Sequence, residues 1–336
     1  MIAVLGAGNW GTTLADLIAG NGHAVRLWTR SEAARDEINR HRTHEAAVPG
    51  LALAEGVAAT TELVAAVRGA GTVVMVIPSQ AFREVARALG DVLSPEQVVL
   101  SATKGLERGS NARMTEILRA ETCARQIGVL SGPNLAPEIA RRKPAGTVVA
   151  SRFPYVIERA RDALSCPRMM VFAGDDVLGV ELAGALKNIV AIAAGAATEM
   201  EVGENAKSLL VTRGLAEITR LAVTMGAQPL TFAGLAGVGD LMVTCASPLS
   251  RNHRVGAALA RGERLDAILA RLGMVAEGVY AAVAARELCR AHRVDAPLLD
   301  AVYRVLYEGL SCDAGLRELM TLPAGRDVAR FASLAL

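Results

Sequence analysis

Near the start of the chain stands Ile2-Ala3-Val4-Leu5-Gly6-Ala7-Gly8-Asn9-Trp10-Gly11, four apolar residues followed by glycines spaced G-x-G-x-x-G. Gly6 allows a tight turn, Gly8 lets the backbone approach a pyrophosphate, and Gly11 lets a helix pack close to the preceding strand. The N-terminus of that helix attracts phosphate charge. Because the motif follows a strand pattern and opens a helix, it predicts a dinucleotide-binding loop; the alternative is a purely structural turn.

Short apolar runs alternate with helical patterns through the first half of the chain. The runs that predict strands are Ile2–Leu5, Val25–Trp28, Val73–Ile77, Val98–Ala102, Ile127–Leu130 and Thr147–Ala150. This alternation is typical of an α/β protein with a mostly parallel sheet covered by helices on both faces. We therefore predict an N-terminal, doubly wound domain of the Rossmann type.

From Asp176 onward the pattern becomes helical throughout. Residues 177–226 are nearly continuous helix formers, and further helices are expected at 241–246, 255–260, 265–272, 276–292 and 298–307. We predict a C-terminal all-helical domain, with one domain at 1–176 and the other at 177–336. A homodimer through the apolar, small-residue helices of the second domain is a further expectation.

Composition excludes several classes of protein. Of the 336 residues, 52% are hydrophobic and only 3% are aromatic, so a large aliphatic core is expected, and a net charge of +2 gives no reason to expect a nucleic acid or an anionic membrane as partner. The five scattered cysteines predict free thiols in a reducing cytoplasm and no metal site. No signal peptide is visible. Residues 178–198 are strongly apolar but contain Glu181 and Lys187, which favours a buried helix over a membrane span.

The second expected strand ends in Trp28-Thr29-Arg30. An acidic residue at this position would bind the ribose 2′-hydroxyl of NAD, whereas an arginine suits the 2′-phosphate of NADP. The cofactor is therefore NADP or NAD, with NADPH slightly favoured. The alternative is a solvated Arg30, with Glu32 serving the ribose.

Lysine is rare in this chain, because only Lys104, Lys143, Lys187 and Lys207 contribute to its 36 basic residues. Arginine replaces lysine on surfaces but not where an amine must lose a proton, so each lysine is a candidate for chemistry. Lys104 follows a strand end, where ligands of open α/β sheets bind, as Pro78 does; the alternative is a surface loop. Lys187 has small or apolar neighbours one turn away. It is either desolvated with a lowered pKa, ready for proton exchange, or extends to water.

Two further segments carry polar side chains suited to a substrate. Asp240 and Thr244 are four residues apart and share a helix face, although Asp240 could equally be a simple helix N-cap. The run Ser250-Arg251-Asn252-His253-Arg254 supplies arginines with amide and hydroxyl donors, which suits a phosphate monoester. The alternative for this run is a solvated basic turn.

Taken in order, these motifs closely resemble the bacterial-type NAD(P)-dependent glycerol-3-phosphate dehydrogenases over nearly the whole chain. The matching segments are residues 6–12, 76–80, 102–107, 130–133, 179–188, 212–217, 234–241, 249–252 and 275–279. The resemblance implies reversible hydride transfer between NAD(P)H and dihydroxyacetone phosphate, which gives sn-glycerol 3-phosphate for phospholipid synthesis. It also implies that Lys187 exchanges the proton with the substrate oxygen and that Lys104 polarises the carbonyl.

The residue patterns and the resemblance together define the candidate site. The candidate catalytic residues are Lys187, Lys104 and Asp240. The candidate substrate-binding residues are Lys104, Gly132, Asn134, Lys187, Asp240, Thr244, Ser250, Arg251 and Asn252. The candidate cofactor-binding residues are Gly6, Gly8, Asn9, Trp10, Gly11, Arg30, Pro78, Lys104, Ala136, Arg251, Val275 and Glu277.

The chain departs from the family pattern in three places. Asn9 stands where serine is usual, Asn134 and Leu135 replace the usual serine or threonine and phenylalanine, and residues 141–146 are larger than usual on an expected surface loop. Two rival functions stay open at this point. One is a β-hydroxyacid dehydrogenase or ketopantoate reductase, and the other is a catalytically silent NAD(P)-binding regulator.

Overall fold

The computed structural model describes residues 1–273 and 275–321. The chain forms two compact units. The first holds Met1–Thr103 and Ala112–Val177, and the second holds Lys104–Asn111 together with the chain from Leu178 onward. The predicted boundary after residue 176 therefore does not account for the segment 104–111. This segment follows β5 in the sequence but belongs to the second unit.

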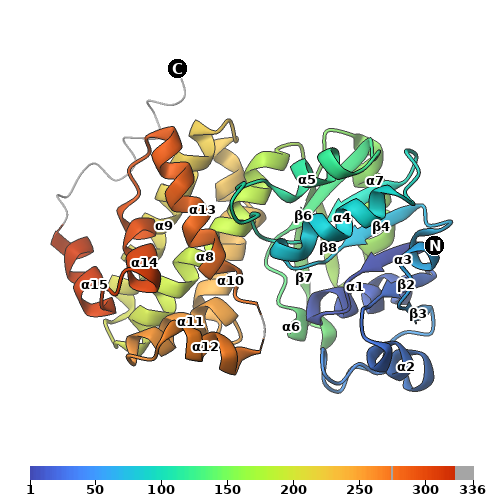
Figure 1. Ribbon diagram of the computed structural model, residues 1–336, viewed down its shortest axis with the longest axis horizontal. Helices are drawn as coiled ribbons and strands as arrows, with labels where there is room; N and C mark the ends of the chain where they lie inside the picture. The colour runs from blue at the N-terminus through green and yellow to red at the C-terminus, as the bar shows by residue number, and fades with distance from the viewer. Residues whose placement is uncertain (274, 322–336) are drawn as a thin grey trace. The chain divides into compact units, whose positions relative to one another are not determined.

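The first unit contains one sheet of eight strands in the order β3-β2-β1-β4-β5-β6-β7-β8 (Figure 1). The strands are β1 (Ile2–Leu5), β2 (Val25–Trp28), β3 (Val57–Thr60), β4 (Thr72–Met75), β5 (Val98–Ser101), β6 (Gln126–Ser131), β7 (Ala145–Ala150) and β8 (Met169–Gly174). Every neighbouring pair is parallel except β6 and β7, which are antiparallel. The predicted mostly parallel, doubly wound sheet is confirmed, while β3 and β8 were not predicted.

Helices cover both faces of this sheet. They are α1 (Asn9–Gly20), α2 (Glu32–His41), α3 (Leu63–Val67), α4 (Phe82–Gly90), α5 (Met114–Glu121), α6 (Ala136–Ala140) and α7 (Pro154–Leu164), with a short 3-10 helix, η1, at Ser79–Ala81. Successive residues of a strand pack on opposite faces of the sheet. Val98 and Leu100 belong to one hydrophobic cluster, and Val99 belongs to another. Strands buried on both faces read as continuous apolar runs, which is why most of them could be found in the sequence.

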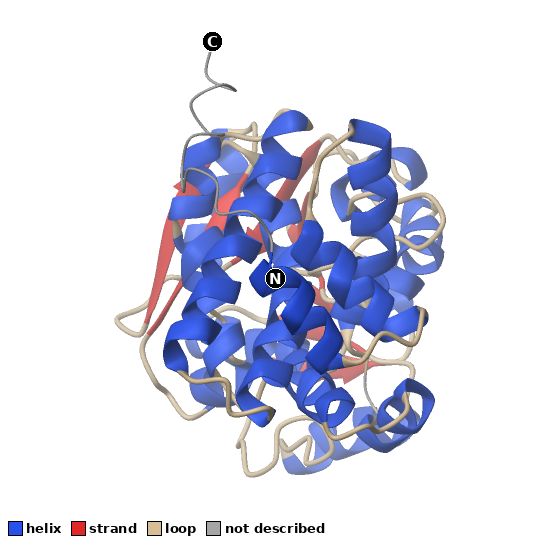
Figure 2. Cartoon of the chain, turned by 90° about the vertical axis from the view of Figure 1, so that its left-hand side faces the viewer, coloured by secondary structure: helices blue, strands red, loops and turns tan. Residues whose placement is uncertain are grey.

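The regular elements of the second unit are all helices in the part of the chain that the structure describes (Figure 2). They are α8 (Val177–Glu199), α9 (Glu204–Thr224), η2 (Pro229–Ala233), a π-helical turn η3 (Leu235–Gly239), α10 (Asp240–Ala246), α11 (Arg251–Ala260), α12 (Leu265–Leu272), α13 (Glu277–His292), α14 (Pro297–Tyr307) and α15 (Cys312–Thr321). The predicted all-helical second half is confirmed. The predicted run over 177–226 is divided by left-handed residues at Glu201 and Gly203, and α15 was not predicted.

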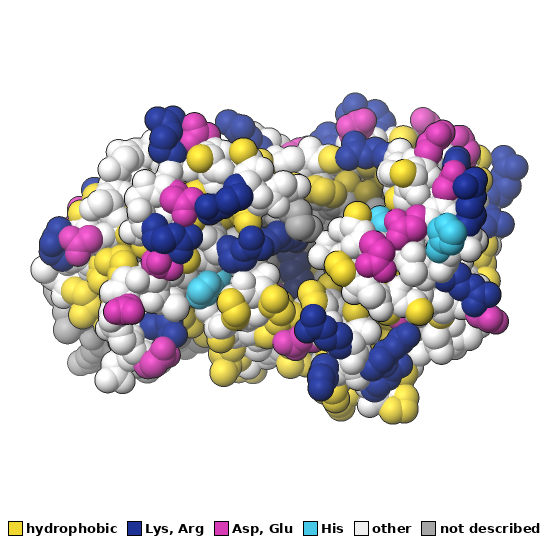
Figure 3. Space-filling view, turned by 90° about the horizontal axis from the view of Figure 1, so that it is seen from below, with side chains coloured by type: hydrophobic (Ala, Val, Ile, Leu, Met, Phe, Trp, Pro, Cys, Tyr) yellow, Lys and Arg dark blue, Asp and Glu magenta, His cyan; other side chains and the backbone are white. Residues whose placement is uncertain are grey.

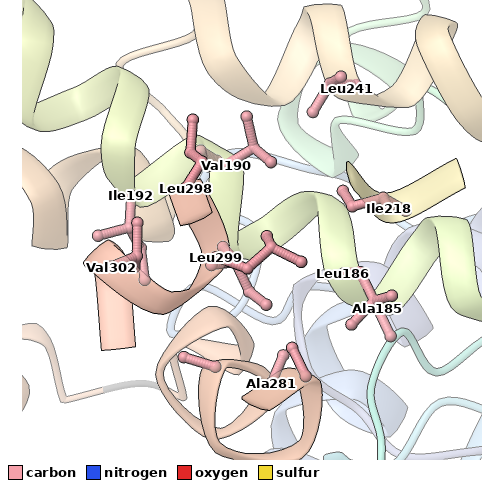
Figure 4. Packing of buried hydrophobic residues seen from close by; sticks show 14 of the residues in the cluster. Ala185, Leu186, Val190, Ile192, Ile218, Leu241, Ala281, Leu298, Leu299 and Val302 are labelled. Atoms are coloured by element: carbon pink, nitrogen blue, oxygen red, sulfur yellow. The ribbon is translucent and has the colours of Figure 1, made fainter. Parts of the chain in front are cut away.

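Helix α8 is the core of the second unit. It is long and apolar enough to cross a membrane, but 89% of its most apolar window is buried inside the protein. Figure 4 shows its residues Leu186, Val190 and Ile192 among apolar side chains of other helices, such as Leu298 and Leu299 of α14. The prediction of a buried helix rather than a membrane span is confirmed.

Glycine allows α11 to lie directly on α8. A Cβ atom added to Gly256 of α11 would lie 1.8 Å from the carbonyl oxygen of Ile192, and one added to Gly195 of α8 would lie 2.0 Å from that of His253. Any side chain at these two positions would push the helices apart. The crossing therefore fixes the first turn of α11, which begins at Arg251, relative to the middle of α8, which carries Lys187.

On the face seen in Figure 3, Lys and Arg side chains lie among Asp and Glu side chains and uncharged residues.

Candidate functional site

A buried carboxylate with two lysine partners lies in the second unit. Asp240 is the first residue of α10, and its Oδ2 is 2.8 Å from Nζ of Lys104 while its Oδ1 is 2.9 Å from Nζ of Lys187. The side chains of Asp240, Lys187 and Lys104 are 2%, 8% and 19% exposed. The alternative that Lys187 extends to water is therefore wrong. The N-cap of α10 is Gly239, so the simple capping role considered for Asp240 is also wrong.

Thr244 completes the hydrogen bonding around Lys187. It lies one turn after Asp240 on α10, and its hydroxyl donates to the Asp240 carbonyl oxygen at 2.6 Å while it accepts a hydrogen bond from Nζ of Lys187. The helical spacing of Asp240 and Thr244 had predicted that they share a face, and both do contact the same ammonium group. Three elements, α8, α10 and the segment 104–111, thus bring these side chains together.

The charges of this cluster do not balance. Two ammonium groups face one carboxylate, so the fully ionised cluster carries a net charge of about +1, which favours an anion or a developing oxyanion nearby. Burial lowers the pKa of the Lys104 ammonium to about 8; Asp240 opposes this shift and the Lys187 charge adds to it. A lysine with such a pKa can exchange a proton near neutral pH. Burial raises the pKa of the neighbouring Cys245 thiol to about 12, so this cysteine is no nucleophile.

The polar run at the start of α11 lies beside the same part of α8. Asn252 donates from Nδ2 to Oδ1 of Asn188 at 2.8 Å, and its own Oδ1 accepts the backbone N–H of Gly278 at 3.0 Å. These two bonds fix the orientation of the Asn252 amide and leave its second N–H for a ligand. Asn188 directly follows Lys187, so the two groups of candidate substrate residues are held together.

Two other residues of this run have distinct environments. Ser250 is the N-cap of α11 and accepts the backbone N–H of His253, which leaves its hydroxyl hydrogen for a ligand. Arg251 is exposed, yet desolvation of its guanidinium by the surrounding residues lowers its pKa, and the carboxylate of Glu277 opposes this shift. An exposed guanidinium, an amide and a hydroxyl at the N-terminus of a helix suit a phosphate group. Val275, another candidate cofactor residue, is partly buried just before α13.

The glycine-rich loop of the first unit has the shape that a dinucleotide requires. Gly6 has a φ of +111°, and a Cβ atom on Gly11 would lie 1.8 Å from the carbonyl oxygen of Gly6, so both positions require glycine. Gly8 is the N-cap of α1, and among the described residues no side chain caps this helix end. Apart from Gly8 and its two chain neighbours, no atom of these residues lies within 4 Å of the position that a Cβ would take. Within the described part of the chain, the buried indole Nε1 of Trp10 has no hydrogen-bond partner. An open backbone cradle at a helix N-terminus fits a pyrophosphate.

The remaining candidates in the first unit follow the carboxyl ends of parallel strands. Arg30 follows β2 and is exposed, Pro78 follows β4, and Gly132 follows β6 with a φ of +149°. Ala136 is the first residue of α6. Asn134 bonds instead to its neighbours in the sheet, because its Nδ2 donates to the Gly146 carbonyl at 3.1 Å and its Oδ1 lies 3.0 Å from the Thr147 hydroxyl. This leaves Asn134 a single N–H for a substrate contact.

Sequence reasoning missed two residues of the site in the second unit. Asn188 and Gly278 stand in motifs that were quoted for the resemblance, yet neither was selected as a site residue. Asn188 had a visible signal, because it is a polar residue next to Lys187 in an otherwise apolar helix. Gly278 had none, because its backbone N–H becomes important only through Asn252.

Comparison with known proteins agrees with this geometry. Residues 1–155 match the family model for the N-terminus of NAD-dependent glycerol-3-phosphate dehydrogenase, and residues 176–317 match the one for its C-terminus. The chain is 43% identical over 324 residues to a glycerol-3-phosphate dehydrogenase (NAD(P)+) of Streptomyces coelicolor, covering 96% of each chain. The chain belongs to the NAD-dependent glycerol-3-phosphate dehydrogenase family. The resemblance drawn from the motifs is confirmed.

Other members of the family are similarly close. A glycerol-3-phosphate dehydrogenase (NAD(P)+) of Moorella thermoacetica is 42% identical over 327 residues, 97% of each chain. The crystal structure of glycerol-3-phosphate dehydrogenase from Coxiella burnetii has a TM-score of 0.91 at 35% identity and covers 95% of this chain and 98% of that one. A ketopantoate reductase from Ralstonia eutropha is similar at a TM-score of 0.59 but only 18% identical, which shows a shared fold alone.

Proposed function

We propose that this chain catalyses reversible hydride transfer between NAD(P)H and dihydroxyacetone phosphate, and that the product, sn-glycerol 3-phosphate, serves phospholipid synthesis. The observation that carries the proposal is the buried Asp240 carboxylate shared by Lys104 and Lys187. Ammonium groups held in this way suit a reaction in which a carbonyl oxygen gains negative charge and then a proton.

The chain's own residues have separate tasks in this reaction. When bound, NAD(P)H supplies the hydride to C2 of the substrate. The Lys187 ammonium donates a proton to the substrate oxygen, and the Lys104 ammonium stabilises the negative charge that develops there. Asp240 orients both ammonium groups, and Thr244 accepts from Lys187, so that the amine keeps one direction through the reaction. In glycerol 3-phosphate oxidation the same groups act in reverse, with Lys187 as the base.

The substrate phosphate is bound by the start of α11. Arg251 supplies charge, and Asn252 and Ser250 supply donors whose orientation is fixed by neighbouring residues. Gly132 and Asn134 are further proposed substrate contacts. A site that provides a guanidinium and several oriented donors to a phosphate distinguishes this substrate from one that carries a carboxylate.

The cofactor is proposed to lie on the glycine-rich loop of the first unit, residues 1–176 in the predicted division. Its proposed contacts are Gly6, Gly8, Asn9, Trp10, Gly11, Arg30, Pro78, Lys104, Ala136, Arg251, Val275 and Glu277. NADPH is slightly favoured because Arg30 is exposed at the end of β2, where a 2′-phosphate would lie. Arg30→Ser should lower kcat/KM for NADPH about tenfold and leave that for NADH within twofold. Equal losses with both cofactors would contradict this role.

We further propose that the enzyme acts in the cytoplasm as a homodimer formed through its helical unit. The aliphatic, small-residue helices of that unit can pack closely against a second copy. Light scattering coupled to size exclusion would give the mass of two 35.1 kDa chains. A single-chain mass at micromolar concentration would contradict the dimer.

One assay tests the proposed activity. NADPH and NADH absorbance is followed in parallel after addition of dihydroxyacetone phosphate. The control substrates are the oxidised, carbonyl form of a β-hydroxyacid and ketopantoate. We expect oxidation of both cofactors with dihydroxyacetone phosphate and none with the control substrates. Preference for a control substrate would favour the rival dehydrogenases, and cofactor binding without oxidation of any kind would favour the silent regulator.

A further inference from the structure

A second buried aspartate lies in the first unit, away from the residues discussed above. Asp16 stands in the middle of α1 between apolar residues, and its side chain is only 2% exposed. A buried carboxylate is costly unless it is paired. Its partner is Arg142, 126 residues further along the chain, with Nη1 at 2.8 Å from Oδ2 and Nη2 at 3.5 Å from Oδ1. Asp16 Oδ1 also accepts the backbone N–H of Ala54 at 3.0 Å.

Arg142 occupies an unusual backbone position to make this contact. Its φ is +63°, in the left-handed region that residues with a side chain adopt only at a cost. Its backbone N–H donates to Ile139 at 2.9 Å, and that of Lys143 donates to Glu138 at 3.1 Å, so the turn that ends α6 is closed around it. The ion pair with Asp16 stabilises this strained turn. Arg142 itself stays 43% exposed, so the segment 141–146 lies at the surface, as expected, and pairs one of its side chains with a buried carboxylate.

The two helices that this ion pair joins both begin at candidate cofactor residues. Helix α1 begins at Asn9, directly after Gly8, and α6 begins at Ala136. The helices pack against each other. Because α6 has only five residues, its own hydrogen bonds cannot hold it rigidly, and its position depends on what anchors its far end. The anchor at that end is Arg142.

We propose that the Arg142–Asp16 ion pair is a positioning pair for the dinucleotide site, which holds α6 against α1 and so sets the spacing between their N-terminal ends. The proposal rests on the proposed function, since it requires that NAD(P)H binds at these ends. Neither residue contacts the cofactor. Losing the arginine leaves the buried Asp16 carboxylate with the Ala54 N–H but without a cationic partner, and it releases the turn after α6. Part of the binding free energy of the cofactor is then used to order this region again.

The test measures cofactor affinity directly, by the fluorescence of NADPH titrated with the full-length enzyme in the absence of substrate. Arg142→Gln is expected to raise the Kd for NADPH about tenfold while kcat at saturating NADPH and the KM for dihydroxyacetone phosphate stay within twofold. Arg142→Lys can still pair with Asp16, so the rise in its log Kd for NADPH should be no more than half of that in Arg142→Gln. The matched control is Arg141→Gln, an exposed neighbour, which should leave the Kd unchanged.

A double variant separates positioning from a general loss of stability. Asp16→Asn combined with Arg142→Gln removes the unpaired buried charge, so it should bind NADPH more tightly than Arg142→Gln alone. A Kd for Arg142→Gln within twofold of the wild type would overturn the proposal, whatever happens to the melting temperature. If Arg142→Gln does not fold, the double variant decides, because it also lacks the ion pair: a Kd for NADPH within twofold of the wild type would overturn the proposal. Wild-type enzyme that binds NADPH but does not reduce dihydroxyacetone phosphate would refute only the proposed activity.

Discussion

Asp16 in the first unit and Asp240 in the second are both buried, and each has a side chain only 2% exposed. Asp16 faces one guanidinium and one backbone N–H, so its charge is balanced by a group that cannot lose its proton. Asp240 faces two ammonium groups, so its surroundings carry an excess of positive charge on groups that can lose a proton. The number and the type of cations, rather than burial, distinguish the surroundings of the two carboxylates, and on this difference we propose a structural role for Asp16 and a catalytic role for Asp240.

Glu217 of α9 is a third buried carboxylate and extends the comparison. It has neither arrangement: its two oxygens accept the backbone N–H groups of Leu298 and Leu299 at 3.0 Å and so cap the start of α14. Burial raises the pKa of Glu217 to about 7, and the two backbone N–H groups oppose this shift. The groups that favour its charged form are the start of α14 and, after it, Arg220 and Arg213, which predicts an effect on stability and none on catalysis.

The largest expected difference is between the two aspartates. Asp240→Asn leaves two ammonium groups without their carboxylate, and kcat/KM for dihydroxyacetone phosphate should fall by about 10²–10³. Asp16→Asn should keep kcat at saturating NADPH within about threefold, while its melting temperature falls by roughly 5 °C. Steady-state kinetics and thermal unfolding of both variants check this. Comparable kinetic losses in the two variants would break the comparison.

A smaller effect is expected in the pH dependence. In the proposed mechanism Lys104 acts as an ammonium that stabilises the oxyanion, and burial lowers its pKa to about 8, well below the ordinary value for lysine. The log of kcat/KM for carbonyl reduction should therefore be level below pH 8 and fall above it as Lys104 loses its proton, by about tenfold per pH unit. In Lys104→Arg the group stays charged, so this alkaline fall should disappear although activity at pH 7 is lower. If the fall of kcat/KM above pH 8 were unchanged in Lys104→Arg, the role proposed for Lys104 would be contradicted.

The smallest effect concerns Glu217. Because its pKa in the folded protein lies above the ordinary value of 4.5, its contribution to stability is complete below about pH 4.5 and is lost as the pH rises through about 7. The wild type should therefore lose roughly 3–5 °C of melting temperature between pH 5 and 8 relative to Glu217→Gln. The matched control is Glu204→Gln, an exposed residue paired only with Lys207 among the ion pairs of the described residues. If the melting temperatures of the wild type and of Glu217→Gln changed equally with pH, the predicted loss of stability with rising pH would be contradicted.

Local pattern was enough to predict much of the fold. Continuous apolar runs predicted β1, β2, β4, β5, β6 and β7, since strands buried on both faces give such runs. The strand β3, with the sequence Val57-Ala58-Ala59-Thr60, has small residues that are compatible with a helix as well. The edge strand β8 is half exposed, so its residues carry no clear period.

The candidate site was predicted where a charged residue broke an apolar pattern, as Lys187 does in α8. The same signal was present for Asp16 in α1 but was not used, and Arg142 could not be assigned to it, because a contact 126 residues apart follows from the tertiary fold and leaves no periodic trace. The membership of residues 104–111 in the second unit was missed for the same reason. Pairings between distant segments are what the structure adds.

The central claim is that Lys187, buried beside Asp240, exchanges the proton with the substrate oxygen, and kcat of Lys187→Arg tests it most directly. Arginine keeps the positive charge beside Asp240 but does not release a proton near neutral pH. The account predicts that kcat falls by about 10³ or more while the variant stays folded and still binds NADPH. A variant that turns over within tenfold of the wild type would contradict it.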